Sequence, residues 1–252
     1  MPLVSDRSIC LRKHEYSETS QILTLFGRTH GMIRVIAKGA HRRTKAGASK
    51  FDGGIDLLDL GDSVFTHDPN RDLATLTEWH LADGYLELRK NLRPMYLGLY
   101  AAELVSLLIE EHDPHPELFD LLQRTLGSLA SDKVEEIFLA FELEMLRQTG
   151  YLPQLETCAS CGQSIESASG FSPGQGGIIC DSCQSSDRLP IDPRLVRLMR
   201  SILRLLPDTS RLPKLTRHQT DPINFILMQH VQHTLGRALM MRHYVAARES
   251  KQ

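Results

Sequence analysis

Four cysteines constrain the fold of this chain more than any other feature of its sequence. Cys158, Cys161, Cys180 and Cys183 form two C-x2-C pairs with eighteen residues between them. Each pair presents two thiolates from one tight turn, and a connector rich in glycine lets the two turns face each other, as a tetrahedral zinc ion requires. Because four thiolates complete the coordination sphere, no position stays open for water. The spacing therefore predicts one structural Zn²⁺ ion.

Two other uses of four cysteines are less consistent with the sequence. Disulfides suit exported proteins, but Asp6 and Arg7 stand where a signal peptide needs an apolar core, so we expect reduced thiols in a cytoplasmic protein. An iron–sulfur cluster also takes four cysteines, but the paired spacing with Gly162 after the first pair favours a zinc ribbon. The fifth cysteine, Cys10, lies in a strand-like run and is expected to be a small buried residue.

Charge is distributed unevenly along the chain, although the formal net charge is only −2. Residues 1–50 carry ten Lys and Arg against three Asp and Glu, and residues 188–252 carry twelve against four. Two basic ends predict a polyanionic partner, although solvated helix faces explain the C-terminal arginines equally well. The longest apolar run, 95–109, is interrupted by Glu103 and is too short to cross a bilayer, so we expect no membrane contact.

The first 80 residues read as a small β-barrel. β-branched and aromatic residues mix with polar ones in five short segments, which is the number of strands in a Greek-key barrel of the OB type. SH3-like barrels share this pattern. The expected strands cover 3–11, 20–27, 32–37, 55–66 and 73–80.

From residue 81 onward the apolar period becomes helical. Asp192-Pro193 and Asp221-Pro222 each resemble an N-cap followed by a first-turn proline. The fold class is therefore α+β: an OB-fold barrel over 1–80, then a mainly α-helical domain over 81–252 with a zinc module inserted at 156–187. The expected helices cover 97–109, 118–129, 134–145, 192–206 and 221–240.

A basic loop follows the third expected strand. Glycine and alanine between its cations leave the backbone free to approach a phosphate chain, and loops of such barrels flank the groove where single strands bind. We expect contacts to phosphates that do not depend on base sequence, with a merely solvated loop as the alternative. The candidate DNA-binding residues are Lys38, Arg42, Arg43 and Lys45 in the loop, with Arg34 and Arg12 on the strands in support.

Aromatic side chains that might stack on bases are few. We expect at least half of them in the core, so that electrostatics dominates over stacking. The candidates are Tyr16, Phe26, Phe51 and Phe65.

Catalytic signatures are missing from the sequence. The segment 39–45 lacks the second glycine of a phosphate-binding loop, and no H-x-E precedes the cysteine pairs as in zinc deaminases. His230 and His233 have the spacing of half a metal site, but no carboxylate joins them, and ordinary histidines explain them better. These observations predict a protein that is not an enzyme.

With these residues in view, the chain resembles the RecO family of bacterial DNA repair proteins. The likeness is closest over Glu15-x-x-Glu18-Thr19-Ser20-Gln21-Ile22-Leu23-Thr24-Leu25-Phe26, then His30-Gly31, then Val35-Ile36-Ala37-Lys38-Gly39-Ala40. The order of barrel, helices and four-Cys module also matches, although some family members lack the cysteines.

The resemblance implies a nucleoid-associated recombination mediator that binds single- and double-stranded DNA, anneals complementary strands and consumes no nucleotide. It also implies contact with the acidic C-terminal tail of the single-stranded-DNA-binding protein SSB, and a partnership with RecR in loading RecA. Two rival interpretations remain: a zinc-ribbon transcription or RNA-binding factor, and an enzyme with a zinc-stapled lid.

Overall fold

A computed structural model of the chain describes residues 2–40, 50–51, 54–66, 72–165, 170–206, 208 and 211–245. These residues fall into two compact units, Met1–Ala130 and Ser131–Gln252. The first unit contains a five-stranded barrel and three helices, and the second contains the cysteine module and the remaining helices.

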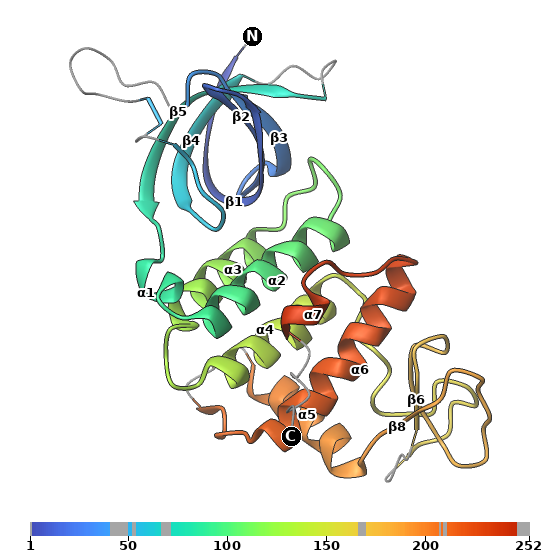
Figure 1. Ribbon diagram of the computed structural model, residues 1–252. Helices are drawn as coiled ribbons and strands as arrows, with labels where there is room; N and C mark the ends of the chain where they lie inside the picture. The colour runs from blue at the N-terminus through green and yellow to red at the C-terminus, as the bar shows by residue number, and fades with distance from the viewer. Residues whose placement is uncertain are drawn as a thin grey trace. The chain divides into compact units, whose positions relative to one another are not determined.

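Five strands close into a barrel in the order β1-β2-β3-β5-β4, as Figure 1 shows. All neighbouring strands are antiparallel except β3 and β5, which are parallel. This arrangement confirms the expected barrel of the OB type followed by a helical region. The strands are β1 (Leu3–Ser17), β2 (Ser20–Gly27), β3 (Gly31–Ala37), β4 (Leu60–Thr66) and β5 (Ala74–Asp83).

The barrel core contains the only tryptophan of the chain. Trp79 is fully buried, and a Cβ at Gly61 on the neighbouring strand would lie 2.5 Å from two indole carbons. A glycine at position 61 is therefore required for the ring to pack against β4. Cys10 is also fully buried in this core, as expected for a small apolar residue, and its burial raises the pKa of the thiol.

Two strand predictions differ from the structure. β1 continues six residues past the expected end at Leu11, because its second half pairs with β2. Residues 55–59 do not form the expected strand. Gln21 donates to the carbonyl oxygen of Ile55 and accepts its N–H, while Leu58 has a positive φ of 68°, so the chain turns before β4 begins at Leu60.

Three helices complete the first unit: α1 (Leu86–Arg89), α2 (Leu92–Leu108) and α3 (Pro116–Ser128). The barrel contacts α3 through the ring of Phe26, 5.8 Å from that of Phe119, and through two hydrogen bonds from the Arg28 guanidinium to Asp120. The Asp120 carboxyl has a lowered pKa, because Arg28 donates to it. Barrel and helices thus form one packed unit.

The second unit contains α4 (Val134–Gln148), α5 (Pro193–Leu205), α6 (Arg217–Leu235) and α7 (Arg242–Val245). Asp192 caps α5 as predicted, since its carboxylate accepts the Arg194 N–H at 2.8 Å. The predicted start of the last helix at Asp221-Pro222 is wrong. The helix begins one turn earlier, where the Gln219 side chain accepts the Thr216 N–H at 2.9 Å, and Pro222 lies inside it.

A three-stranded antiparallel sheet carries the cysteine module. Its strands are β6 (Gly170–Ser172), β7 (Gly177–Ile179) and β8 (Leu189–Pro190), in the order β7-β6-β8. Arg200 of α5 donates to the Leu155 carbonyl at 2.7 Å, and His230 of α6 bonds to the Tyr151 carbonyl at 2.8 Å. Phe171 of β6 packs edge-on to the His230 ring. Two helices therefore fix the module within its unit.

Candidate metal centre and nucleic-acid interface

The structure brings all four predicted cysteines together. The Sγ atoms of Cys158, Cys161, Cys180 and Cys183 all lie within 4.8 Å of one another. A zinc–sulfur bond of about 2.3 Å places the corners of a tetrahedron about 3.8 Å apart. The distance between the Sγ atoms of Cys161 and Cys180 is 3.9 Å. This cluster of four cysteines has the size and donor chemistry of a tetrahedral metal site.

Tight turns hold each pair in the ligating arrangement. The Gly162 N–H donates to the Cys158 carbonyl at 2.8 Å, and the Cys183 N–H donates to the Cys180 carbonyl at 3.2 Å. Gly162 has a φ of +74°, a conformation that costs a residue with a side chain far more than glycine. The glycine immediately after the first pair is therefore a requirement of the turn.

Arg188, the residue before β8, holds the second pair in place. One guanidinium nitrogen donates to the carbonyls of Cys180 and Cys183, at 3.3 and 3.1 Å, and another pairs with Asp181 at 3.1 Å. A Cβ at Gly170 would lie only 2.6 Å from Nε of Arg188, so the glycine leaves the room that this side chain occupies. Arg188 was not among the residues singled out from the sequence, because nothing in the spacing shows which cation reaches these carbonyls.

The environment of Cys158 favours its thiolate. Burial raises the pKa of the thiol, but hydrogen bonds, first among them the one from the Cys180 N–H at 3.4 Å, outweigh it and lower the pKa to about 6. A metal ion binds the deprotonated form of a cysteine, which is the form that these hydrogen bonds favour at Cys158.

The predicted DNA-binding residues divide into two groups. Arg12, Arg34 and Lys38 lie on the barrel, all of them exposed. The remaining three, Arg42, Arg43 and Lys45, lie outside the described residues. No ion pair between described residues uses the side chain of Arg12, Arg34 or Lys38.

Strand pairing places these cations on one outer face of the barrel, which we call the β1–β2–β3 face. Thr24 is the register partner of both Arg12 on β1 and Arg34 on β3. Two residues along the strands, about 7 Å away, Ile22 is the partner of both His14 and Ile36. Side chains directly opposite each other share a face, so arginines, a histidine and two half-buried isoleucines form one surface. Lys38 follows β3 one residue after its last strand position.

A pocket of about 480 Å³ lies at one end of this face. Arg12, Arg34, Ser106 and Glu111 are among the residues that line it. The Arg12 guanidinium donates to the Ser106 hydroxyl through Nε at 3.1 Å and through Nη2 at 2.8 Å. These bonds hold the arginine in one orientation, and among the described residues its charge has no carboxylate partner.

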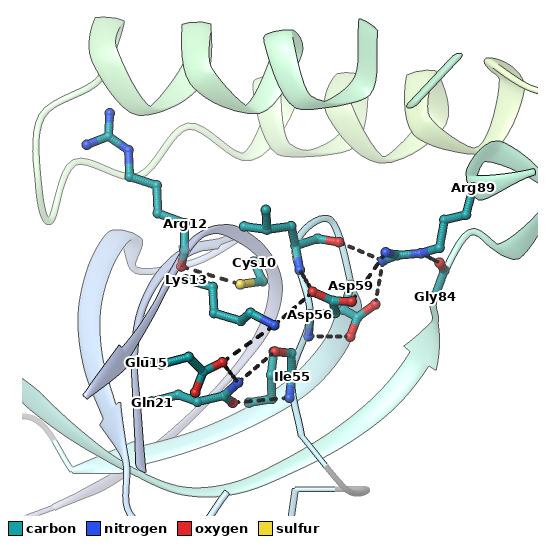
Figure 2. Close-up of polar contacts among 11 residues, drawn as sticks. Cys10, Arg12, Lys13, Glu15, Gln21, Ile55, Asp56, Asp59, Gly84 and Arg89 are labelled. Carbon is teal, nitrogen blue, oxygen red and sulfur yellow. Dashed lines mark hydrogen bonds and ion pairs between the residues drawn. The ribbon is translucent and has the colours of Figure 1, made fainter. Parts of the chain in front are cut away.

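Lys13, the residue after Arg12, does not share this face. Figure 2 shows the two side chains pointing in different directions. The Lys13 ammonium lies 3.0 Å from Asp56 and 3.7 Å from Glu15, and Arg89 of α1 pairs with Asp59 at 2.9 Å beside it. Burial lowers the pKa of Lys13, and the Asp56 carboxylate more than offsets this and raises it overall. This cation is therefore engaged by neighbouring carboxylates at the surface.

Of the four candidate stacking aromatics, three are in the core. Phe26, Phe51 and Phe65 are at most 3 % exposed, whereas Tyr16 near the end of β1 is 63 % exposed. The prediction that at least half are buried is thus confirmed, and the exposed one adjoins the β1–β2–β3 face.

Comparison with known proteins identifies the family. Residues 1–85 match the family model described as Recombination protein O N terminal, and residues 89–243 match that described as Recombination protein O C terminal. The chain belongs to the RecO family. It is 30% identical to the DNA repair protein RecO of Alkaliphilus metalliredigens over 239 residues, 93% of this chain and 95% of the relative. Identity to the DNA repair protein RecO of Rhodopirellula baltica is 35% over 71% of this chain and 66% of the relative.

Among the parts that the structure of this RecO family member describes, no helix has the length and apolar character to span a bilayer.

Sequence reasoning missed His14, Ile22 and Ile36 as members of the β1–β2–β3 face. The signal that would have found them is the strand register, which brings residues from three segments into rows. The division of the chain after residue 80 stays a prediction.

Proposed function

We propose that this RecO family protein is a non-catalytic recombination mediator. It binds single- and double-stranded DNA, anneals complementary strands and, with RecR, helps to load RecA on strands coated by SSB. The observation that carries the proposal is the β1–β2–β3 face, where Arg12 and Arg34 are aligned through one register partner and have no carboxylate partner among the described residues.

Arginines without a carboxylate partner among the described residues can bind the phosphates of DNA directly. An arginine that is not paired with a protein carboxylate loses no ion pair when it binds a phosphate, and each contact releases a counterion from the DNA. Guanidinium contacts to phosphates position the strand without reading its bases. A mediator that acts wherever a strand is exposed needs this kind of affinity.

Lys38 also lies on the barrel, and Arg42, Arg43 and Lys45 follow it in the sequence. We propose that all four hold phosphates, with Arg34 and Arg12 in support, as the resemblance to the family implies. Lys38 is exposed, which is consistent with this role.

We propose that the cysteine cluster holds one Zn²⁺ ion with a structural role. The donor set is four thiolates, and the 3.9 Å between two of the Sγ atoms matches a tetrahedral zinc site. Once filled, such a site has no open coordination position, so the ion fixes β6 and β7 against the two cysteine turns and performs no reaction.

The proposed partners are RecR and the acidic C-terminal tail of SSB. For the tail, the second unit offers a groove of about 630 Å³ between the zinc module and α6, lined by Arg188, His233 and Arg237 among others. The Asp187 carboxylate in this groove already accepts hydrogen bonds from Ser172 at 2.6 Å and from the Gly174 N–H at 2.6 Å, which lower its pKa to about 2. Arg237 is exposed and complements an acidic peptide.

The test is annealing of complementary oligonucleotides already coated with cognate SSB, without nucleotide and across a salt series. The proposal expects rapid annealing that weakens as salt rises. Binding without annealing, or failure on coated strands alone, would favour the zinc-ribbon nucleic-acid-binding factor over the mediator.

A further inference from the structure

A second pocket, of about 410 Å³, lies on the barrel near the end of the β1–β2–β3 face. Its volume is within the range of sites that take small ligands. The lining combines an aromatic ring, aliphatic and aromatic core residues, a hydroxyl and two cations. Described residues that line it include Tyr16, Ser20, Ile36, Lys38, Lys50 and Phe51.

Tyr16 is the unusual member of this lining. Its side chain is 63 % exposed, whereas Phe51, the other aromatic residue of the lining, is 3 % exposed. The strand register shifts between Glu15 and Ser17, so Tyr16 lies at a bulge, where strands commonly redirect a side chain. No hydrogen bond between described residues holds its hydroxyl.

Lys38 and Lys50 make the lining of the pocket positively charged, which suits a ligand with negative charge better than a purely apolar one. Lys38 and Lys50 are both exposed, and no ion pair between described residues uses either side chain. The floor is apolar, because Phe51 is 3 % exposed and Ile36 is half-buried. A ligand that fits this combination has a flat apolar face with negative charge beside it.

We propose that this pocket takes one unpaired nucleobase of single-stranded DNA, stacked on Tyr16, with its flanking phosphates on Lys38 and Lys50. The inference rests on the proposed DNA-binding function and deepens it by naming the form of DNA that this site prefers. A base in a duplex already stacks on its neighbours and cannot present its face to a tyrosine ring, so the pocket favours single strands over duplex.

The experiment compares two oligonucleotides of equal length and charge, a labelled oligo-dT and the same sugar–phosphate chain with abasic sites. Binding to the full chain is measured by fluorescence anisotropy. Wild type is expected to bind oligo-dT about tenfold more tightly than the abasic chain, because stacking one base on an aromatic ring typically strengthens binding by about this factor. Tyr16→Ala should abolish this ratio and leave the salt dependence unchanged, since stacking releases no counterion.

Two variants serve as controls. Tyr16→Phe keeps the ring and should keep the ratio. Phe225→Ala removes a ring that is 45 % exposed on α6 in the other unit and should also keep the ratio.

A third variant tests the phosphate contact. Lys38→Ala should weaken the binding of both oligonucleotides alike, because both carry the same phosphates.

The outcomes separate the base pocket from the underlying function. If wild type binds both oligonucleotides equally, or if Tyr16→Ala keeps the tenfold ratio, the base pocket is refuted while DNA binding stands. If wild type binds neither oligonucleotide, the proposed function fails and the pocket fails with it.

Discussion

The salt dependence of DNA binding gives the sharpest test of the β1–β2–β3 face. We consider the double variant Arg34→Ala/Lys38→Ala. Both side chains are exposed and neither is used in an ion pair between described residues, so each is free to contact one phosphate. A phosphate contact on a single strand contributes about 0.7 to the slope of log affinity against log salt concentration.

Removing two such contacts should therefore reduce the slope by about 1.4 units. Between 50 and 200 mM salt, the affinity of wild type should fall about sevenfold more than that of the variant. Fluorescence anisotropy with a labelled oligo-dT over this salt range measures both slopes. Since both positions are exposed, the variant should keep its stability to within about 0.5 kcal/mol, which thermal denaturation checks.

Arg7→Ala provides the matched control. It removes the same kind of charge from the same barrel, but from the segment of β1 that pairs with β4, and the Arg7 guanidinium donates to Asp62 at 2.8 Å. An arginine engaged in this way should leave the slope unchanged. A double variant with the wild-type slope, or an Arg7→Ala variant that loses as much slope, would refute the assignment of this face.

Three further predictions concern the fold that supports these sites. Cys158→Ser should lose one equivalent of zinc by metal analysis and destabilise the module, to which the ion contributes on the order of 10 kcal/mol, while the fluorescence of Trp79 shows the barrel still folded. Retention of one zinc per chain would contradict the four-Cys site. Gly61→Ala should destabilise the barrel by about 1–3 kcal/mol, because the new Cβ would lie 2.5 Å from the buried indole, and an unchanged urea midpoint would disprove this packing. Burial lowers the pKa of His230 below the ordinary 6.5, so the unfolded chain binds a proton at this residue more readily than the folded chain does. The contribution of neutral His230 to the stability of the fold is therefore fully present above pH 6.5, and it is lost as the pH falls through the lower pKa of the folded state. His230→Gln should flatten the pH dependence of the urea midpoint of the second unit between pH 7.5 and 5, and a profile as steep as wild type would reject this origin.

The features that the sequence predicts well depend on spacing within a short segment. The cluster of four cysteines is one, because two C-x2-C pairs can approach each other wherever the connector permits, and Gly162 marks the turn. The OB-type barrel is another, because five short apolar segments have few ways to bury their faces.

Features with a weak local signal, or with contacts between distant segments, are predicted less well. The start of α6 at Arg217 was missed because Asp221-Pro222 is a strong local signal, whereas the Thr216–Gln219 capping pair that forms the first turn is a weaker one. The strand expected at 55–59 was overridden by the Gln21 side chain, which lies 34 residues earlier and satisfies the backbone of Ile55.

A single register shift decides whether Arg12 or Lys13 lies on the β1–β2–β3 face. Cys10 is opposite Leu25 and lies in the core, so strict alternation would send Arg12 inward beside Leu23 and Lys13 outward. The shift between Cys10 and Arg12 inserts one residue into β1, which reverses this order. Arg12 then stands beside Thr24 on the outer face, and Lys13 turns toward the acidic groups at the base of the barrel. The bulge, which composition cannot reveal, thus places Arg12 on the β1–β2–β3 face and Lys13 beside the carboxylates of Glu15 and Asp56.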